Sequence, residues 1–191
     1  MANNLNSLAK ILLSSDAISG ISKQTNVSSA DVTSILSTAL PALLNGANKQ
    51  ASQKSTAESF LEALQNHGAN DTSNISSFLK NVDAKDGAKI IEHLLGGKTK
   101  DVAKDVAKTS STGVKSADVV KVLAVAAPLI MSLIGKQANK KKDGDALTSI
   151  ASMLGSDEVK SLATSLLGAK TNKNSNIDLA DVLNIAGKLF K

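Results

Sequence analysis

Apolar residues recur every three or four positions along the chain, which is the spacing of an amphipathic helix. Before Gly97 no segment shows the alternation of apolar and polar residues that predicts a β-strand. We therefore predict an all-α protein of about eight to ten helices. The apolar stripes lie in residues 5–12, 18–21, 32–44, 60–64, 75–79, 90–95, 119–134, 147–154, 159–167 and 179–190.

Residues that typically begin or end helices lie between these stripes. A Ser followed three residues later by a carboxylate predicts a capping box, and glycine after the last helical residue predicts an end. The predicted starts are Ser15, Ser28 with Asp31, Ser55 with Glu58, and Asp83 with Asp86, and the predicted ends are Gly68 and Gly96-Gly97.

The most informative pattern is an internal repeat. Residues 27–50 align without gaps on residues 114–137, and Pro41 and Pro128 coincide. A proline inside a helix removes a hydrogen bond and crowds the preceding turn, so each should kink its helix or divide it. Just before the repeat, Asn26 matches Gly113, and both residue types tolerate a left-handed backbone. We expect two pseudo-symmetric units packed through these kinked core helices.

The repeat and the composition predict four parts of the chain. They are a first repeat unit with its connecting helices (1–97), a second repeat unit (98–138), a Lys-rich linker (139–145) and a C-terminal helical segment (146–191). Ala180-Asp181-Val182 echoes Ala30-Asp31-Val32 and hints at a degenerate third copy.

The most apolar segment, Val119 to Ile134, is interrupted by Lys121 and Pro128. It falls short of the roughly 20 residues that span a bilayer, so we predict a buried core helix and no transmembrane segment. The first 17 residues lack the long apolar stretch and cleavage site of a secretory signal. Cytoplasmic localisation is the resulting expectation.

The residues that usually perform catalysis or bind metals are few and dispersed. The chain has no Cys and only two His, His67 and His93, without a helical partner ligand. We interpret His67 as a residue near a helix C-terminus and His93 as a surface or boundary residue. Gly96-Gly97-Lys98-Thr99 lacks the first glycine of a phosphate-binding loop. We expect no catalytic residue, no cofactor and no metal site, and hence no enzyme.

Positive charge is carried by lysine alone: the chain has no Arg, and its formal net charge is +5. Arginine and aromatic rings usually read bases, so their scarcity argues against sequence-specific nucleic-acid recognition. Lys140, Lys141 and Lys142 are a candidate contact for a polyanion, but we favour a solvated linker, because Asp143 and Asp145 lie beside them.

Several short motifs resemble the bacterial YidB-like family, known as domain of unknown function 937. They are residues 86–97, Thr112-Gly113-Val114 and Ala126-Ala127-Pro128-Leu129, with similar motifs in the first half at residues 21–22, 26–28, 39–41 and 60–64. The resemblance implies a multihelical fold and a bacterial origin. It implies no activity, substrate or catalytic residue.

Two functions are compatible with these patterns. The preferred one is a non-enzymatic structural protein of the bacterial cytoplasm that assembles with itself into a homo-oligomer or larger assembly, since quasi-repeated helices with small residues can pack against copies of themselves. The alternative is a binding module or adaptor, which uses either a helix groove for a protein partner or lysines for weak, non-specific nucleic-acid binding. Groove binding predicts a concave apolar cleft between the two units.

Overall fold

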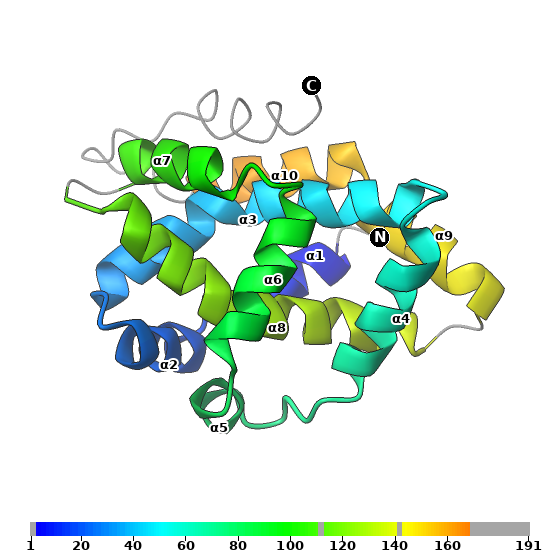
Figure 1. The fold of residues 1–191 in the computed structure, drawn as a ribbon, viewed down its shortest axis with the longest axis horizontal. Helices are drawn as coiled ribbons and strands as arrows, with labels where there is room; N and C mark the ends of the chain where they lie inside the picture. The colour runs from blue at the N-terminus through cyan, green and yellow to red at the C-terminus, as the bar shows by residue number, and fades with distance from the viewer. Residues whose placement is uncertain (1–2, 111–112, 141–142, 169–191) are drawn as a thin grey trace.

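The computed structural model describes residues 3–110, 113–140 and 143–168. Its described residues form ten helices and no strand, which confirms the all-α prediction (Figure 1). The helices are α1 (Asn3–Leu12), α2 (Ser15–Thr25), α3 (Ser29–Ser52), α4 (Ala57–Gly68), α5 (Ile75–Lys80), α6 (Ala84–Leu94), α7 (Thr99–Thr109), α8 (Ser116–Ala138), α9 (Asp143–Met153) and α10 (Ser156–Gly168).

Helix α8 lies at the centre of the fold, in contact with α2, α4, α6 and α7 (Figure 1). Nearly all of its residues from Val119 to Ile134 are buried, as predicted for a core helix. With 23 residues α8 is long enough to cross a bilayer, so the prediction that this segment is too short to span one was wrong. Among the described helices it alone could span a membrane by length and composition, and 72% of its apolar window is buried in the protein; α2 and α3 qualify only together, as a span bent by 107°.

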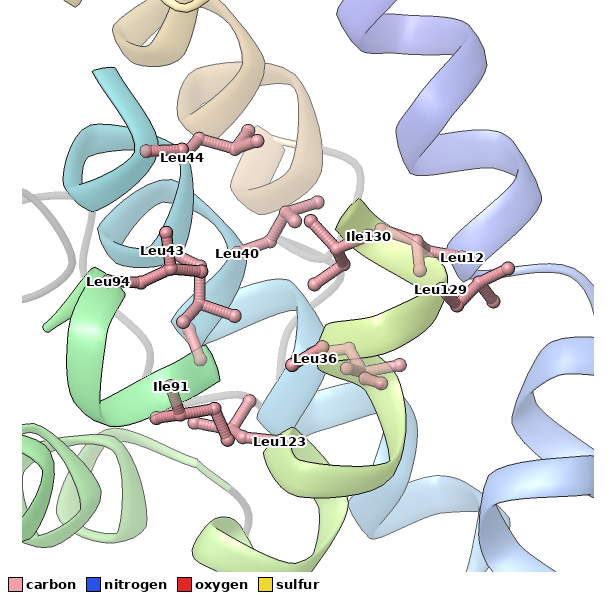
Figure 2. Close-up of a cluster of buried hydrophobic side chains, with 14 of the residues drawn as sticks. Leu12, Leu36, Leu40, Leu43, Leu44, Ile91, Leu94, Leu123, Leu129 and Ile130 are labelled. Carbon is pink, nitrogen blue, oxygen red and sulfur yellow. The ribbon is translucent and has the colours of Figure 1, made fainter. Parts of the chain in front are cut away.

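Helix α3 supplies the second half of the core. Its leucines, including Leu36 and Leu40, are fully buried. Figure 2 shows these side chains in one cluster with Leu123 and Ile130 of α8 and with Ile91 and Leu94 of α6. Full burial of one such side chain contributes about 1.5–3 kcal/mol, so this aliphatic layer is a major source of stability. Helices α9 and α10 pack against α3 as well.

Helix α6 crosses α8 at a glycine. A Cβ atom added to Gly87 would overlap the carbonyl oxygen of Ala124 in α8. Pro128 stands four residues after Ala124 and has no N–H, so that oxygen lacks the donor that an unbroken helix would supply. The two backbones can approach here because Gly87 has no side chain.

Helix α4 crosses α8 through two glycines. A Cβ on Gly135 would overlap the Leu64 oxygen, and one on Gly68 would overlap the backbone of Gly135. Gly68 is the last residue of α4, and positive φ among the described glycines occurs at Gly96, Gly97 and Gly113 only. The predicted end of the helix near Gly68 is confirmed, but its assignment as a glycine beyond the helix is wrong: Gly68 is helical, and its small size serves the crossing.

Most predicted helix boundaries are confirmed. Ser28 accepts a hydrogen bond from the Asp31 N–H, and Asp83 accepts one from the Lys85 N–H. Helix α2 begins at Ser15, with Ser14 as its cap. After α6, the Gly97 N–H donates to the Glu92 oxygen and the Gly96 N–H donates to the His93 oxygen, which is a Schellman ending.

The second predicted capping box is wrong. Helix α4 begins at Ala57 with Thr56 before it, and no side chain caps this start. The Thr56 hydroxyl instead donates to the Gln50 carbonyl of α3. This bond holds the tight turn between α3 and α4, so the chain enters α4 later than Ser55 and Glu58 suggest.

The two prolines lie inside unbroken helices. Helices α3 and α8 run through Pro41 and Pro128, so the alternative in which proline divides its helix is wrong. Both helices change direction along their length in Figure 1, and a kink caused by proline stays a prediction. The left-handed residues are confirmed, since φ is 56° at Asn26 and 98° at Gly113. Pseudo-symmetry of the two units is not established by these observations.

The segment after α8 packs on the rest of the chain. Helix α9 begins at Asp143, inside the predicted linker 139–145. Helix α9 contacts α3 and α8, and α10 contacts α3 and α1. The last predicted helix and the Ala180-Asp181-Val182 echo lie outside the described residues. The four-part division of the chain stays a prediction.

Candidate functional site

Helices α4 and α6 lie over α8 (Figure 1). Residues of the three helices line two adjoining cavities, which we call together the α4–α6 furrow. The cavities have volumes of about 450 and 340 Å³. His67 lines both cavities. Pro128 of α8 lines the larger one, and Met131 of α8 lines the smaller one. These two α8 residues are nearly one helical turn apart, so the cavities follow one another along the same face of α8.

The smaller cavity is the apolar end of the furrow. Its apolar walls are Phe60 and Ala63 from α4, Ile90 and Leu94 from α6, and Met131 from α8. Its polar lining consists of Gln50, Thr56, Ser59, His67 and His93.

Hydrogen bonds hold three helices together at the apolar end. The Gln50 side chain donates to the His93 carbonyl over 2.9 Å and so joins the end of α3 to α6. The Thr56 hydroxyl donates to the Gln50 carbonyl, also over 2.9 Å, and joins the start of α4 to α3. The apolar walls are therefore fixed relative to one another before any ligand enters.

The larger cavity is the acidic end of the furrow. Asp71, Asp83 and Asp86 line it, and none of its lining residues is a lysine. Its other lining residues are His67, Asn70, Asn74, Ser77, Phe78, Asn81, Val82 and Pro128.

Local chain geometry explains the position of each carboxylate. Asp83 caps α6 and Asp86 lies in its first turn, where the helix dipole stabilises negative charge. Asp71 accepts a hydrogen bond of 2.8 Å from the Ser73 N–H in the loop after α4. The backbone of Ser73, then its side chain, and Lys136 to a smaller extent lower the pKa of Asp71, so this carboxyl is ionised at neutral pH.

A short chain of polar contacts ties the acidic end to α8. The Asn70 amide donates to the Ser132 hydroxyl over 3.2 Å, and that hydroxyl donates to the Pro128 carbonyl over 2.8 Å. The Lys136 ammonium donates to the Thr72 hydroxyl next to Asp71. These contacts position the loop between α4 and α5 against the furrow.

The structure brings together two residues that sequence reasoning kept apart. His67 near the end of α4 and His93 on the exposed surface of α6 occupy the kinds of position predicted for them, and both line the apolar end. Their proximity depends on how α4 and α6 cross α8. No local pattern in the sequence carries that information.

The remaining sequence candidates contribute little to the furrow. Lys140 is exposed after the end of α8, while Lys141 and Lys142 lie outside the described residues. Asp31 bonds to the Ser28 cap, and Asp118 pairs with Lys121 over 3.2 Å at the start of α8. Within the described part of the chain no group of three His, Asp or Glu side chains is arranged to hold a metal ion.

Comparison with known proteins identifies a family. Residues 8–137 match the family described as "Bacterial protein of unknown function (DUF937)". The chain belongs to this family. The resemblance seen in the sequence motifs is thereby confirmed, and the matched region of the DUF937 chain includes every residue that lines the furrow. No curated protein and no solved structure matches the chain.

Proposed function

We propose that this DUF937 chain is a non-enzymatic binding module whose α4–α6 furrow accepts an amphipathic helix with basic residues at one end. The observation that carries the proposal is the junction of an apolar cavity and an acidic cavity along one face of α8. An amphipathic helix presents a row of side chains of matching character to such a groove. Cavities of about 450 and 340 Å³ are large enough for side chains that project from a helix lying across them.

The dimensions and the charges support a helical ligand. From Phe60 to Asn70 the furrow follows about ten residues of α4 and its exit, a length of about 15 Å or nearly three helical turns. Three carboxylates without a lining lysine favour a cationic end and repel an acidic one. The side-chain hydrogen bonds of Gln50, Thr56 and Asn70 hold the helices around the furrow in place. This fixed arrangement lowers the entropy lost on binding.

The proposal is tested with two synthetic helices of equal length that share a leucine stripe, one ending in lysines and the other in glutamates. Each is titrated into dilute protein that carries an environment-sensitive dye on His93→Cys, at the furrow. The chain has no other Cys, so labelling is specific. The expected result is saturable binding of the lysine-ended helix, and at least about tenfold weaker binding of the glutamate-ended one.

A variant and a control locate the binding. Ala63→Arg places a long charged side chain into the apolar end, so it should abolish the dye response to both helices. The same dye on Ala88→Cys, exposed on α6 outside the furrow lining, should respond weakly. Absence of saturable binding by either helix would reject the proposed function.

Self-assembly remains a second proposal, supported by a different surface. A groove of about 580 Å³ lies between α1 and α10, where Leu13 and Leu166 are only half-buried beside the buried Leu162. Apolar side chains of this kind at an open groove can pack against a second copy. Molar mass measured by light scattering should rise with concentration, and a monomer at every concentration would refute self-assembly. Residence in the bacterial cytoplasm likewise remains a proposal.

A further inference from the structure

The chain itself contains a segment with the chemistry that the furrow selects. Beyond α10, the sequence pattern of residues 178–191 predicts an amphipathic helix that starts at Asp178. Lys188 and Lys191 stand at its far end. Its apolar positions are Leu179, Val182, Leu183, Ile185, Leu189 and Phe190.

We infer that the α4–α6 furrow binds residues 178–191 of a second copy of this chain. The inference rests on the proposed function and names its partner. The apolar positions of the segment match the apolar end, formed by Phe60, Ile90 and Met131 among others. Lys188 and Lys191 match the carboxylates of the acidic end, where no lysine lines the cavity. The segment has 14 residues, or about 21 Å as a helix, so it covers the furrow of about 15 Å and exceeds it by about one turn.

Charge favours contact between the furrow and the lysines of the segment over contact with other regions of the second copy. Each chain has a formal net charge of +5, so two copies repel one another over most approaches. The acidic end is a local exception to this excess, and it attracts the lysines of the segment. Binding should therefore weaken as salt screens the attraction between the lysines and the carboxylates.

The position of α10 favours a second copy over the same chain. Helix α10 packs against α3 and α1, and in Figure 1 it lies behind α3, whereas α4 and α6 lie in front of α8. Helix α10 is the last described element, and it ends at Gly168. A second copy can offer the segment to the furrow without the chain having to pass around α3. Because each copy then offers one furrow and one segment, two copies can exchange segments in a closed dimer, or the contact can repeat head-to-tail into rings or filaments.

Single cysteines in separate full-length chains test the inference directly, since the native chain has none. One chain carries His93→Cys at the furrow and the other carries Asn184→Cys in the segment. The two are mixed and oxidised, and covalent dimers are measured on a denaturing gel. The matched control replaces His93→Cys by Ala88→Cys, which is exposed on α6 but does not line the furrow.

The expected result is a mixed dimer with His93→Cys and at least about tenfold less with Ala88→Cys. Adding Leu183→Glu to the segment chain should lower the dimer yield to the control level, because a carboxylate would enter the apolar end. Leu183→Met should preserve the yield.

Three results would overturn the inference. The first is a mixed-dimer yield equal to the control. The second is a crosslink within one chain that carries both cysteines, with no mixed dimer, which would place the segment in its own furrow. The third is preferential crosslinking of Asn184→Cys to Asn6→Cys, which would place it in the groove between α1 and α10. If the lysine-ended helix still binds the furrow in these cases, the proposed function survives and only the named partner is wrong.

Discussion

Helices α3 and α8 begin at aligned serines and contain aligned prolines, yet their neighbours contact them differently. α8 is crossed by α6 at Ala124 and by α4 at Gly135, and both crossings bring backbones together. α3 has one comparable contact, where Gly46 meets the carbonyl oxygen of Leu94 at the end of α6. The close crossings on α8 are what place α4 and α6 on either side of the furrow.

The hydrogen bonding of buried polar side chains also differs between α8 and α3. Ser132 of α8 is buried and hydrogen-bonded to both Asn70 and the Pro128 carbonyl. The aligned residue in α3 is Asn45, whose buried side-chain oxygen has no hydrogen-bond partner among the described residues. The difference shows that one repeated pattern yields two environments: α8 is the closely packed base of the furrow, and α3 retains unpaired polar groups.

The largest effect on stability is expected for Gly87→Ala, at the close crossing on α8. The new methyl group would overlap the Ala124 oxygen, so α6 must move away from α8, and we expect a loss of about 3 kcal/mol in the free energy of unfolding. Gly46→Ala should cost about half as much, because Leu94 is the last residue of α6 and can yield more easily. Urea denaturation measures both. Ala88→Val, exposed on α6, is the control, and a Gly87→Ala protein as stable as this control would contradict the close crossing.

A smaller effect should separate the two prolines. Pro128→Ala restores an N–H that can donate to the Ala124 oxygen and so straighten α8 beneath Gly87, which should disturb the crossing; we expect a loss of about 2 kcal/mol in the free energy of unfolding. Pro41→Ala likewise supplies an N–H donor to the Ser37 carbonyl, but no glycine crossing is packed against that carbonyl. Its effect on the free energy of unfolding should stay below about 1 kcal/mol. Equal losses for the two variants would show that the proline is not linked to the α6 crossing.

The smallest expected change is a gain of stability in α3. The hydroxyl of Thr38 is buried without a hydrogen-bond partner among the described residues, and the aligned residue of α8 is the buried Val125. Thr38→Val keeps the shape and removes the unpaired hydroxyl, so the free energy of unfolding should rise by about 1 kcal/mol. The midpoint of thermal unfolding would report the change. A lower midpoint would indicate that the Thr38 hydroxyl has a favourable role.

The helices could be predicted from the sequence because their signals are local. Ser28, Asp83 and the Gly96-Gly97 pair act within a turn of the helix end they define, and the apolar stripe of α8 identifies a buried helix whatever surrounds it. The furrow could not be predicted in this way. It depends on crossings between segments distant in the sequence, such as Gly87 on Ala124, and the same tertiary demand explains why Gly68, where α4 does end, lies inside the helix and not beyond its last residue.

The claim that charge and apolar surface in the α4–α6 furrow select a basic amphipathic helix is tested most directly by charge reversal. The affinities of the lysine-ended and glutamate-ended helices are measured for the native chain and for Asp83→Lys/Asp86→Lys, with circular dichroism to verify that the variant is folded. The account predicts that the native chain prefers the lysine-ended helix and that the variant prefers the glutamate-ended one. The same preference in both proteins would contradict it.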